Sequence, residues 1–311
     1  MTERYLEMRD GHRLFLRTWD AVDKPLGTLH INHGMAEHSL RYDDFARYLN
    51  GLGFIVYAQD HRGHGFTKEE EEKGWFAFQD GWKLVTEDAI AVDELIMKEH
   101  ESLPHFILGH SMGSFITRSE LIKVSDWFSA AIIMGSGAGQ GLVGKVGKAI
   151  ASRHVRKFGS RMPDHKMTKL SFGSYNRHFR PNRTDSDWLT RDEAEVDKYL
   201  NDPLCGFVCS SQFFVDLLTG IELANDPSQA KKVSKVLPML IISGAEDPVG
   251  SYGKGIRRIE KLYKDAGLYD VRVKLFDKDR HEILNELDKS DVYSYIGSYL
   301  VQIAGSFAGD E

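Results

Sequence analysis

Ser111 lies between two glycines in the stretch "FILGHSMGSF" at 106–115. An apolar run precedes it and a segment of helical period follows, which is the strand, turn and helix setting that a nucleophilic serine of the G-x-S-x-G type requires. Gly109 and Gly113 would let neighbouring backbone approach this turn, and the Met112 amide would face a developing oxyanion at the start of the helix. The pentapeptide alone is a weak signal, and a structural serine in a tight turn is the alternative.

A serine becomes a nucleophile only when a base takes its proton and an acid orients that base. His281, the last histidine of the chain, directly follows the apolar run 271–276, and Asp247 closely follows the run 239–243. Because the carboxyl ends of parallel strands meet at one edge of a sheet, we expect Ser111, Asp247 and His281 to converge there as a catalytic triad. Other acids that remain open for this position are Glu246, Asp277 and Asp279.

The segment "HINHGMAEHSLRY" at 30–42 follows another apolar run. Gly34 would let the chain turn back towards the serine, and the amide of Met35 is then the best second donor to an oxyanion. A rival interpretation places a metal ion among five histidines, namely His30, His33, His38, His61 and His64. No H-E-x-x-H spacing supports a metal, so we expect hydrogen-bonded turns here, with neither a metal nor another cofactor.

The rest of the chain alternates short apolar runs with segments of helical period, a pattern that predicts a mostly parallel sheet covered by helices on both faces. A hairpin around Asp10-Gly11 opens the chain. Together with it, the predicted strands make eight; the other six lie at 28–33, 54–59, 105–109, 130–134, 239–243 and 271–276. The predicted helices lie at 42–52, 82–100, 112–124, 254–266 and 290–303.

About a hundred residues separate the sixth and seventh predicted strands, far more than a usual connection. We therefore divide the chain into a core of residues 1–136 and 236–311 and a helical cap, or lid, of residues 137–235. One helical face near the end of the cap carries Phe213, Phe214, Leu217, Leu218 and Ile221. This face packs on the core, lines an apolar ligand channel, or does both. A transient contact of the cap with a membrane surface is a further expectation.

Composition narrows the class of protein. The 311 residues carry 46 acidic and 40 basic side chains, a net charge of −6, with the two signs spread along the chain, so we expect no nucleic-acid partner. The first residues are charged and lack the apolar segment of a secretory signal, which predicts a cytoplasmic protein. Cys205 and Cys209, the two cysteines, are expected to be reduced thiols.

Five motifs, "HGMAEHSLRYDDFARYL", "DHRGHG", "GHSMG", "EDPVG" and "RHEILNE", occur in this order. With them the chain resembles the monoacylglycerol lipase and bacterial lysophospholipase branch of the α/β-hydrolase superfamily over nearly its whole length. The resemblance implies the α/β-hydrolase fold with a cap after the sixth strand. It also implies the triad named above, an oxyanion hole of the Met35 and Met112 amides, and a lipid-like carboxylic ester as substrate.

The sequence departs from this family at two places. Members commonly continue the serine motif as G-H-S-M-G-G, whereas Ser114 stands at the last position here. Lys278 and Asp279 replace the small residues that usually precede Arg-His, which could shift the pH profile of His281. A thioesterase and a non-catalytic binding module are alternatives, as is an aminopeptidase, in which Glu37, Glu193 or Glu195 would hold the substrate amine.

Overall fold

The computed structural model describes residues 1–67 and 72–307. Eight strands form one sheet in the order β1-β2-β4-β3-β5-β6-β7-β8. Their bounds are β1 Thr2–Glu7, β2 Arg13–Trp19, β3 Gly27–Asn32, β4 Phe54–Gln59, β5 His105–His110, β6 Ala130–Met134, β7 Met239–Gly244 and β8 Val271–Phe276. β1 pairs antiparallel with β2 and β2 with β4, while all later pairings are parallel. The predicted hairpin and mostly parallel sheet are confirmed.

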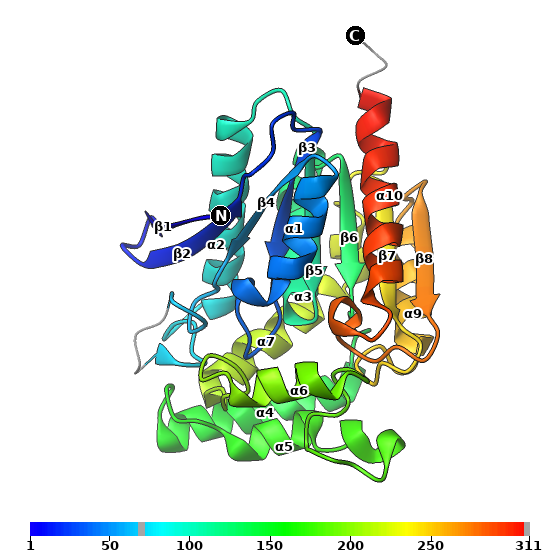
Figure 1. Ribbon diagram of the computed structural model, residues 1–311. Coiled ribbons are helices and arrows are strands. Elements are labelled where there is room, and N and C mark those ends of the chain that lie inside the picture. Colours follow the sequence, from blue (N-terminus) through cyan, green and yellow to red (C-terminus); the bar gives the residue numbers. More distant parts are fainter. Residues whose placement is uncertain (68–71, 308–311) are drawn as a thin grey trace.

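Helices cover both faces of this sheet (Figure 1). α1 (Asp43–Gly51) and α10 (Lys289–Phe307) pack on one face. α2 (Gly81–Glu99), α3 (Met112–Val124) and α9 (Lys254–Asp265) cover the other. Short 3-10 turns lie at η1 Ser39–Tyr42, η3 Ser125–Trp127, η4 Tyr175–Phe179 and η5 Ile283–Asn285. All five predicted helices are present, with ends within a few residues of those expected.

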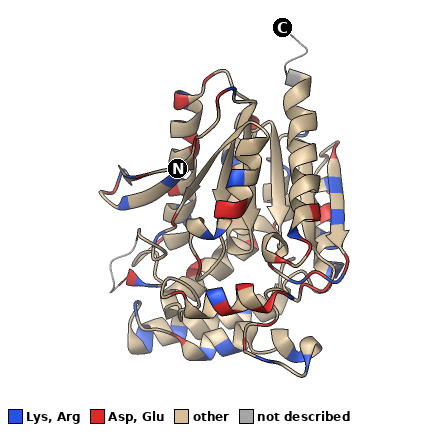
Figure 2. Cartoon of the chain, viewed as in Figure 1, with Lys and Arg blue, Asp and Glu red and all other residues tan. Residues whose placement is uncertain are grey.

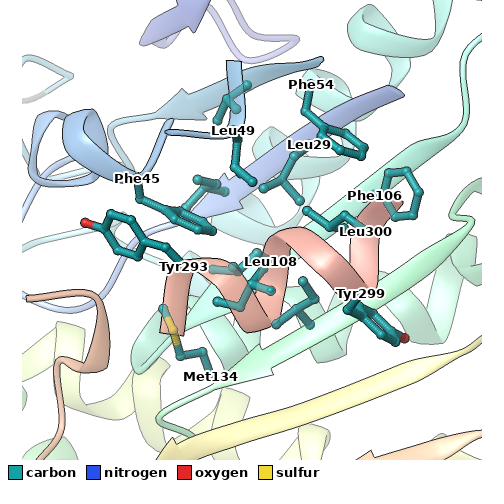
Figure 3. Packing of buried hydrophobic residues seen from close by; sticks show 14 of the residues in the cluster. Leu29, Phe45, Leu49, Phe54, Phe106, Leu108, Met134, Tyr293, Tyr299 and Leu300 are labelled. Carbon is teal, nitrogen blue, oxygen red and sulfur yellow. The ribbon is translucent and has the colours of Figure 1, made fainter. Parts of the chain in front are cut away.

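The central strands are buried on both faces, which is why they read as continuous apolar runs. On one face, apolar side chains of α1 and α10 meet those of the strands in a single cluster (Figure 3). It includes Leu29, Phe45, Leu49, Phe54, Phe106, Leu108, Met134, Tyr293, Tyr299 and Leu300. This close packing fixes the strand ends from which the candidate site is built.

The long segment between β6 and β7 is helical, as predicted. Its helices are α4 Gly141–Phe158, α5 His165–Phe172, α6 Glu193–Asn201, α7 Ser211–Ala224 and α8 Pro227–Ala230. α4, α5 and α6 lie beyond the end of the sheet to which the β6 arrow points, which is the carboxyl end of the parallel strands (Figure 1). Among the described residues, every helix is too short or too polar to cross a bilayer.

The structure shows what the apolar face of α7 contacts. Phe213, Phe214, Leu217, Leu218 and Ile221 are all buried in one cluster with side chains of α2 and α3. None of the five is among the residues that line the cavity described below. The face therefore packs on the core, as one of the two interpretations predicted, and these five residues do not line that cavity.

Candidate active site

Ser111 occupies the turn between β5 and α3 in a backbone conformation that L-residues rarely adopt, with φ +52° and ψ −118°. Its amide donates to the Met134 carbonyl at 3.0 Å, which holds the turn against the end of β6. A non-glycine residue at positive φ costs free energy and persists where the surrounding structure requires it. The turn predicted between a strand and a helix at Ser111 is therefore present, and its backbone is strained.

The two glycines of the motif permit this turn because backbone passes close to both. A side chain on Gly113 would overlap the carbonyls of Asn32 and His33, and one on Gly109 would overlap Gly113 itself. The β3 end is thereby brought against the first turn of α3. Both glycines have the steric role that the sequence predicted.

Asp247 and His281 meet at the carboxyl ends of β7 and β8. The Asp247 carboxylate lies 3.0 Å from Nδ1 of His281, and it also accepts hydrogen bonds from the Ser243 hydroxyl at 3.0 Å and the Val249 amide at 2.8 Å. Burial alone would raise the pKa of Asp247, but the His281 ring and these two donors outweigh it, so its pKa lies below the ordinary value. Asp247 is thus held as a carboxylate beside the imidazole.

The alternative acids are engaged elsewhere or lie apart from the ring. Asp279 is buried and pairs with Arg191 at 2.6 Å, and its carboxylate makes no hydrogen bond with His281. Neither Glu246 nor Asp277 contributes a side-chain hydrogen bond to the imidazole among the described residues. The geometry therefore favours Asp247 as the partner of His281.

Ser111 and His281 line the same cavity, of about 610 Å³, at this edge of the sheet. The His281 ring contacts two aromatic rings, with centroid separations of 4.8 Å to His110 and 5.0 Å to Trp188. No hydrogen bond joins the Ser111 hydroxyl to the imidazole in this structure. Such bonds are often long or misaligned without substrate. The hydroxyl and the imidazole therefore share one cavity without being hydrogen-bonded to each other.

The loop after β3 passes beside the serine, as predicted. A side chain on Gly34 would come within 3.2 Å of Ser111 Cβ, and the Gly34 amide donates to Glu37. Among the described residues, the amides of Met35 and Met112 donate to no protein acceptor. Both amides are therefore free to bind an oxyanion, and the pairing of the two remains a proposal.

Three of the five histidines of the rival metal interpretation pack together, with the His33 ring centroid 4.2 Å from that of His61 and 5.4 Å from that of His64, but their nitrogens form no group with metal-ligand spacing among the described residues. His30 bonds to Asp93 and Gln59, His33 to the Gly34 carbonyl, and His64 to the Arg62 carbonyl. Within the described ranges, groups with metal-ligand spacing contain at most one of the five, namely His30 with Asp93 and Glu120, and His38 with Asp202 and Cys205. Both cysteines are unpaired and buried, as expected.

Sequence reasoning missed a buried ionic group behind the oxyanion loop. Arg41 pairs with Glu282 through two bonds of 2.6 and 2.7 Å and with Glu37 at 2.9 Å. Burial alone would raise the pKa of Glu37, but the His110 hydrogen bond and the Arg41 charge hold it well below its ordinary value. The group ties the loop of Gly34 to the loop of His281. The sequence offered one signal for this group: the motif "HGMAEHSLRYDDFARYL" contains Arg41 and the motif "RHEILNE" contains the oppositely charged Glu282.

The insertion also contributes to the site in a way that no motif indicated. The His281 amide donates to the Trp188 carbonyl at 3.4 Å, and the next amide donates to Leu189 at 2.7 Å. Apolar side chains from the insertion line much of the cavity, namely Phe172, Trp188, Leu189, Tyr199, Leu200 and Phe207. The described site therefore belongs to both parts of the chain.

The protein has a serine on a strained strand-to-helix turn above a mostly parallel eight-stranded sheet, and an Asp-His pair at later strand ends. These features define an α/β-hydrolase. The family model Hydrolase_4, described as "Serine aminopeptidase, S33", matches residues 23–288, and the chain belongs to this family.

Named relatives agree with this assignment. The chain is 28% identical to human monoglyceride lipase, with 96% of this chain and 90% of that protein covered. It is 28% identical to phospholipase YtpA of Bacillus subtilis, with coverages of 89% and 95%. A solved structure of a thermostable carboxyl esterase from Bacillus coagulans, in complex with glycerol, matches with a TM-score of 0.90 at 26% identity and covers 97% of this chain and 98% of its own.

Proposed function

We propose that the protein is a serine hydrolase that cleaves carboxylic esters of lipid-like substrates, a monoacylglycerol or a lysophospholipid. The observation that carries the proposal is the shared cavity, in which a strained Ser111 faces the Asp247–His281 pair under an apolar wall. Relatives named monoglyceride lipase and phospholipase, and the esterase solved with glycerol, support this substrate class.

The proposed reaction has two halves. His281 takes the proton of Ser111, whose oxygen attacks the ester carbonyl, and the amides of Met35 and Met112 stabilise the oxyanion. The alcohol leaves with the proton from His281, and water then attacks the acyl-enzyme by the reverse route. Asp247 holds the imidazole in the required tautomer and stabilises its cation.

The cavity suits an ester with one long acyl chain. Aromatic and aliphatic side chains of the insertion form an apolar wall, while Ser111 and His281 mark the polar end. Burying a methylene group is worth about 0.8 kcal/mol, so chain length should govern affinity. We propose that residues 137–235 act as the cap that supplies this preference.

The decisive experiment compares wild type with Ser111→Ala. We expect the wild type to hydrolyse a nitrophenyl ester and a monoacylglycerol and to be labelled by a fluorophosphonate. The variant should lose about 10⁶ in turnover and all labelling while keeping its circular dichroism spectrum and melting temperature. A folded variant with a tenth of the wild-type turnover would contradict the assignment.

A second activity, cleavage of small amino-terminal residues, is suggested by the description of the family. It needs an acid for the substrate amine. Glu37 is paired with Arg41 and Glu195 with Lys198, while Glu193 lies 3.7 Å from Arg183 with its side chain 78% exposed. Because none of these three is a free acid in the cavity, the ester is favoured. Rates on a monoacylglycerol and on an amino-acyl amide, measured side by side, distinguish the two activities.

We further propose that the cap contacts a membrane surface transiently. Leu142, Val143 and Val146 on α4 are 80%, 75% and 59% exposed, an apolar patch on the outer side of the insertion. Exposed apolar side chains on an amphipathic helix are typical of contact with the interface of a bilayer. The contact would bring the cavity to a substrate that resides in lipid.

A further inference from the structure

Ser114, the residue that stands where family members commonly have glycine, contacts the nucleophile's own backbone. Its hydroxyl lies 2.5 Å from the Ser111 carbonyl oxygen, which also accepts the Ser114 amide at 3.0 Å. The same hydroxyl lies 2.7 Å from the hydroxyl of Ser136, the last residue of the core before the insertion. Both side chains are buried, so water does not compete for these bonds.

The donors of this group can be assigned by counting hydrogens. Ser114 has one hydroxyl proton, and the Ser111 carbonyl can only accept, so this proton goes to the carbonyl. Ser136 then donates to Ser114, and Arg118 Nη1 donates to Ser136 at 3.4 Å. The bonds form one chain with a single direction, from a guanidinium through two hydroxyls to the carbonyl of Ser111.

Arg118 supplies this chain with a charge that no carboxylate neutralises. Its side chain is fully buried, and no acidic group within the described ranges lies at ion-pairing distance. It donates to the Ala224 carbonyl at 2.5 Å, to the Asn225 side chain at 3.0 Å and to the Tyr263 hydroxyl at 3.1 Å. A buried cation held only by neutral acceptors is costly. Its field is not cancelled locally.

The end of the chain of bonds is the peptide unit that matters for catalysis. The carbonyl of Ser111 and the amide of Met112 belong to the same peptide group. A strong hydrogen bond to the carbonyl draws electron density from the nitrogen, which makes the N–H a better donor. Successive bonds that point the same way strengthen one another by about 10–30% each.

We propose that Ser114 and Ser136 are positioning residues that polarise the Ser111–Met112 peptide, so that the Met112 amide binds the reaction's oxyanion more strongly. This role rests on the proposed function, because it requires that Met112 serves the oxyanion. Serine in place of glycine at 114 adds a link that the usual motif lacks. The chain of bonds strengthens in the transition state, when the negative charge forms, and contributes little to substrate binding.

The expected size follows from two magnitudes. One oxyanion donor is worth a factor of about 10²–10³ in turnover, and the polarisation alters its bond by about 10–30%. Ser114→Ala and Ser136→Ala should therefore each lower kcat about two- to eight-fold and leave KM unchanged. The inhibition constant of an alkyl trifluoromethyl ketone, which forms a tetrahedral oxyanion on Ser111, should rise by the same factor.

Ser119→Ala is the matched control. Ser119 lies on the same helix, is equally buried and donates to a backbone carbonyl four residues earlier, but its hydroxyl contacts Trp82 rather than the site. We expect its kcat and ketone affinity to equal those of wild type. Because the two serines act through one chain of bonds, the double variant Ser114→Ala with Ser136→Ala should lose no more than the larger single loss.

Three results would overturn the inference, given a wild type that hydrolyses the ester. They are an unchanged kcat and ketone affinity in both folded variants, losses that add in the double variant, and an effect on KM alone. If Ser114→Ala fails to fold, Ser136→Ala carries the test, because it leaves the α3 sequence intact. A wild type without ester turnover would instead refute the proposed function, so the two failures are distinguishable.

Discussion

Asp247 is the residue whose contacts decide how the base of the site is oriented. Two donors and the imidazole share its carboxylate, so the side chain has little freedom. The contact with Nδ1 in turn restrains the ring of His281, which lines the cavity. An amide in this position would keep the shape of the carboxylate. It would remove the charge that stabilises the imidazolium and favour the wrong tautomer.

We therefore expect Asp247→Asn to lower kcat by about 10⁴ while the protein stays folded. Asp279→Asn is the control in the kinetic assay, because Asp279 pairs with Arg191 and not with the imidazole. Steady-state hydrolysis of a nitrophenyl ester measures both. A loss in Asp279→Asn as large as that in Asp247→Asn would return Asp279 to consideration as the orienting acid.

Asp216 gives a second prediction at this scale, on stability rather than activity. It lies in α7, packed against Gly81, and desolvation raises its pKa to about 7. The unfolded chain titrates this group near its ordinary value of about 3.9. The folded state thus holds the proton more strongly, and the contribution of Asp216 to stability declines as pH rises from about 4 to 7.

Asp216→Asn removes this titration. In urea unfolding, the variant should gain stability relative to wild type as pH rises from 5 to 8, because only the wild type must bury a charge at the higher pH. The amide also keeps an acceptor for Gln212, which bonds to the carboxylate at 3.2 Å. A difference between the two proteins that does not change with pH would contradict the raised pKa.

At the scale of elements, the sequence was informative where local pattern and chain order suffice. The glycines beside Ser111 predicted the turn because the steric demand is local, and the order of strand ends predicted where Asp247 and His281 would lie. For α7, the spacing of apolar residues showed an amphipathic helix but could not show which surface its apolar face meets. That information resides in α2 and α3, far away in the sequence.

The approach of α7 to α2 depends on one glycine. A side chain on Gly220 would overlap the ring of Trp82. Gly220→Ala should therefore force the helices apart and lower stability by about 1–3 kcal/mol from overpacking, although alanine favours the helix by up to about 1 kcal/mol. Thermal unfolding measures the net change.

Gly305→Ala is the matched control for that prediction. Gly305 is also helical, in α10, and a side chain there would meet nothing within 4 Å. This variant should keep or slightly raise the melting temperature. If Gly220→Ala were as stable as Gly305→Ala, the packing of α7 on Trp82 would be looser than the structure shows.

Across the whole molecule, charge is less evenly distributed than expected from the sequence totals. Residues 141–183 contain eleven lysines and arginines and one acid, Asp164, within a chain of net charge −6. Seven of these basic residues belong to α4 and α5, where Figure 2 shows blue bands, and the other four lie in the segments after these helices. The expectation that both signs are spread along the chain is wrong for this segment, because a count over all residues hides a local excess. Only the fold could show that this basic segment lies beyond the carboxyl end of the sheet.

The basic excess adds a charge preference to the proposed membrane contact. Each lysine or arginine near an anionic lipid surface contributes about 1 kcal/mol, and salt weakens this attraction. We expect wild type to sediment with phosphatidylglycerol vesicles more than with phosphatidylcholine vesicles, and the difference to shrink in 0.5 M salt, a concentration chosen because it shortens the Debye length to about 4 Å. Neutralising the exposed α4 residues Lys145, Arg153 and Arg156 to glutamine should abolish that preference.

The control for that experiment neutralises three exposed basic residues on another helix. Lys254, Arg258 and Lys261 lie on α9, where acidic side chains accompany the basic ones and Lys261 pairs with Asp265 at 2.9 Å. Their replacement by glutamine removes the same charge from the molecule, so a loss of binding caused by net charge alone would be equal in both triple variants. Loss confined to the α4 variant assigns the lipid contact to the cap. Equal binding of wild type to both kinds of vesicle would leave the basic segment without a role at membranes.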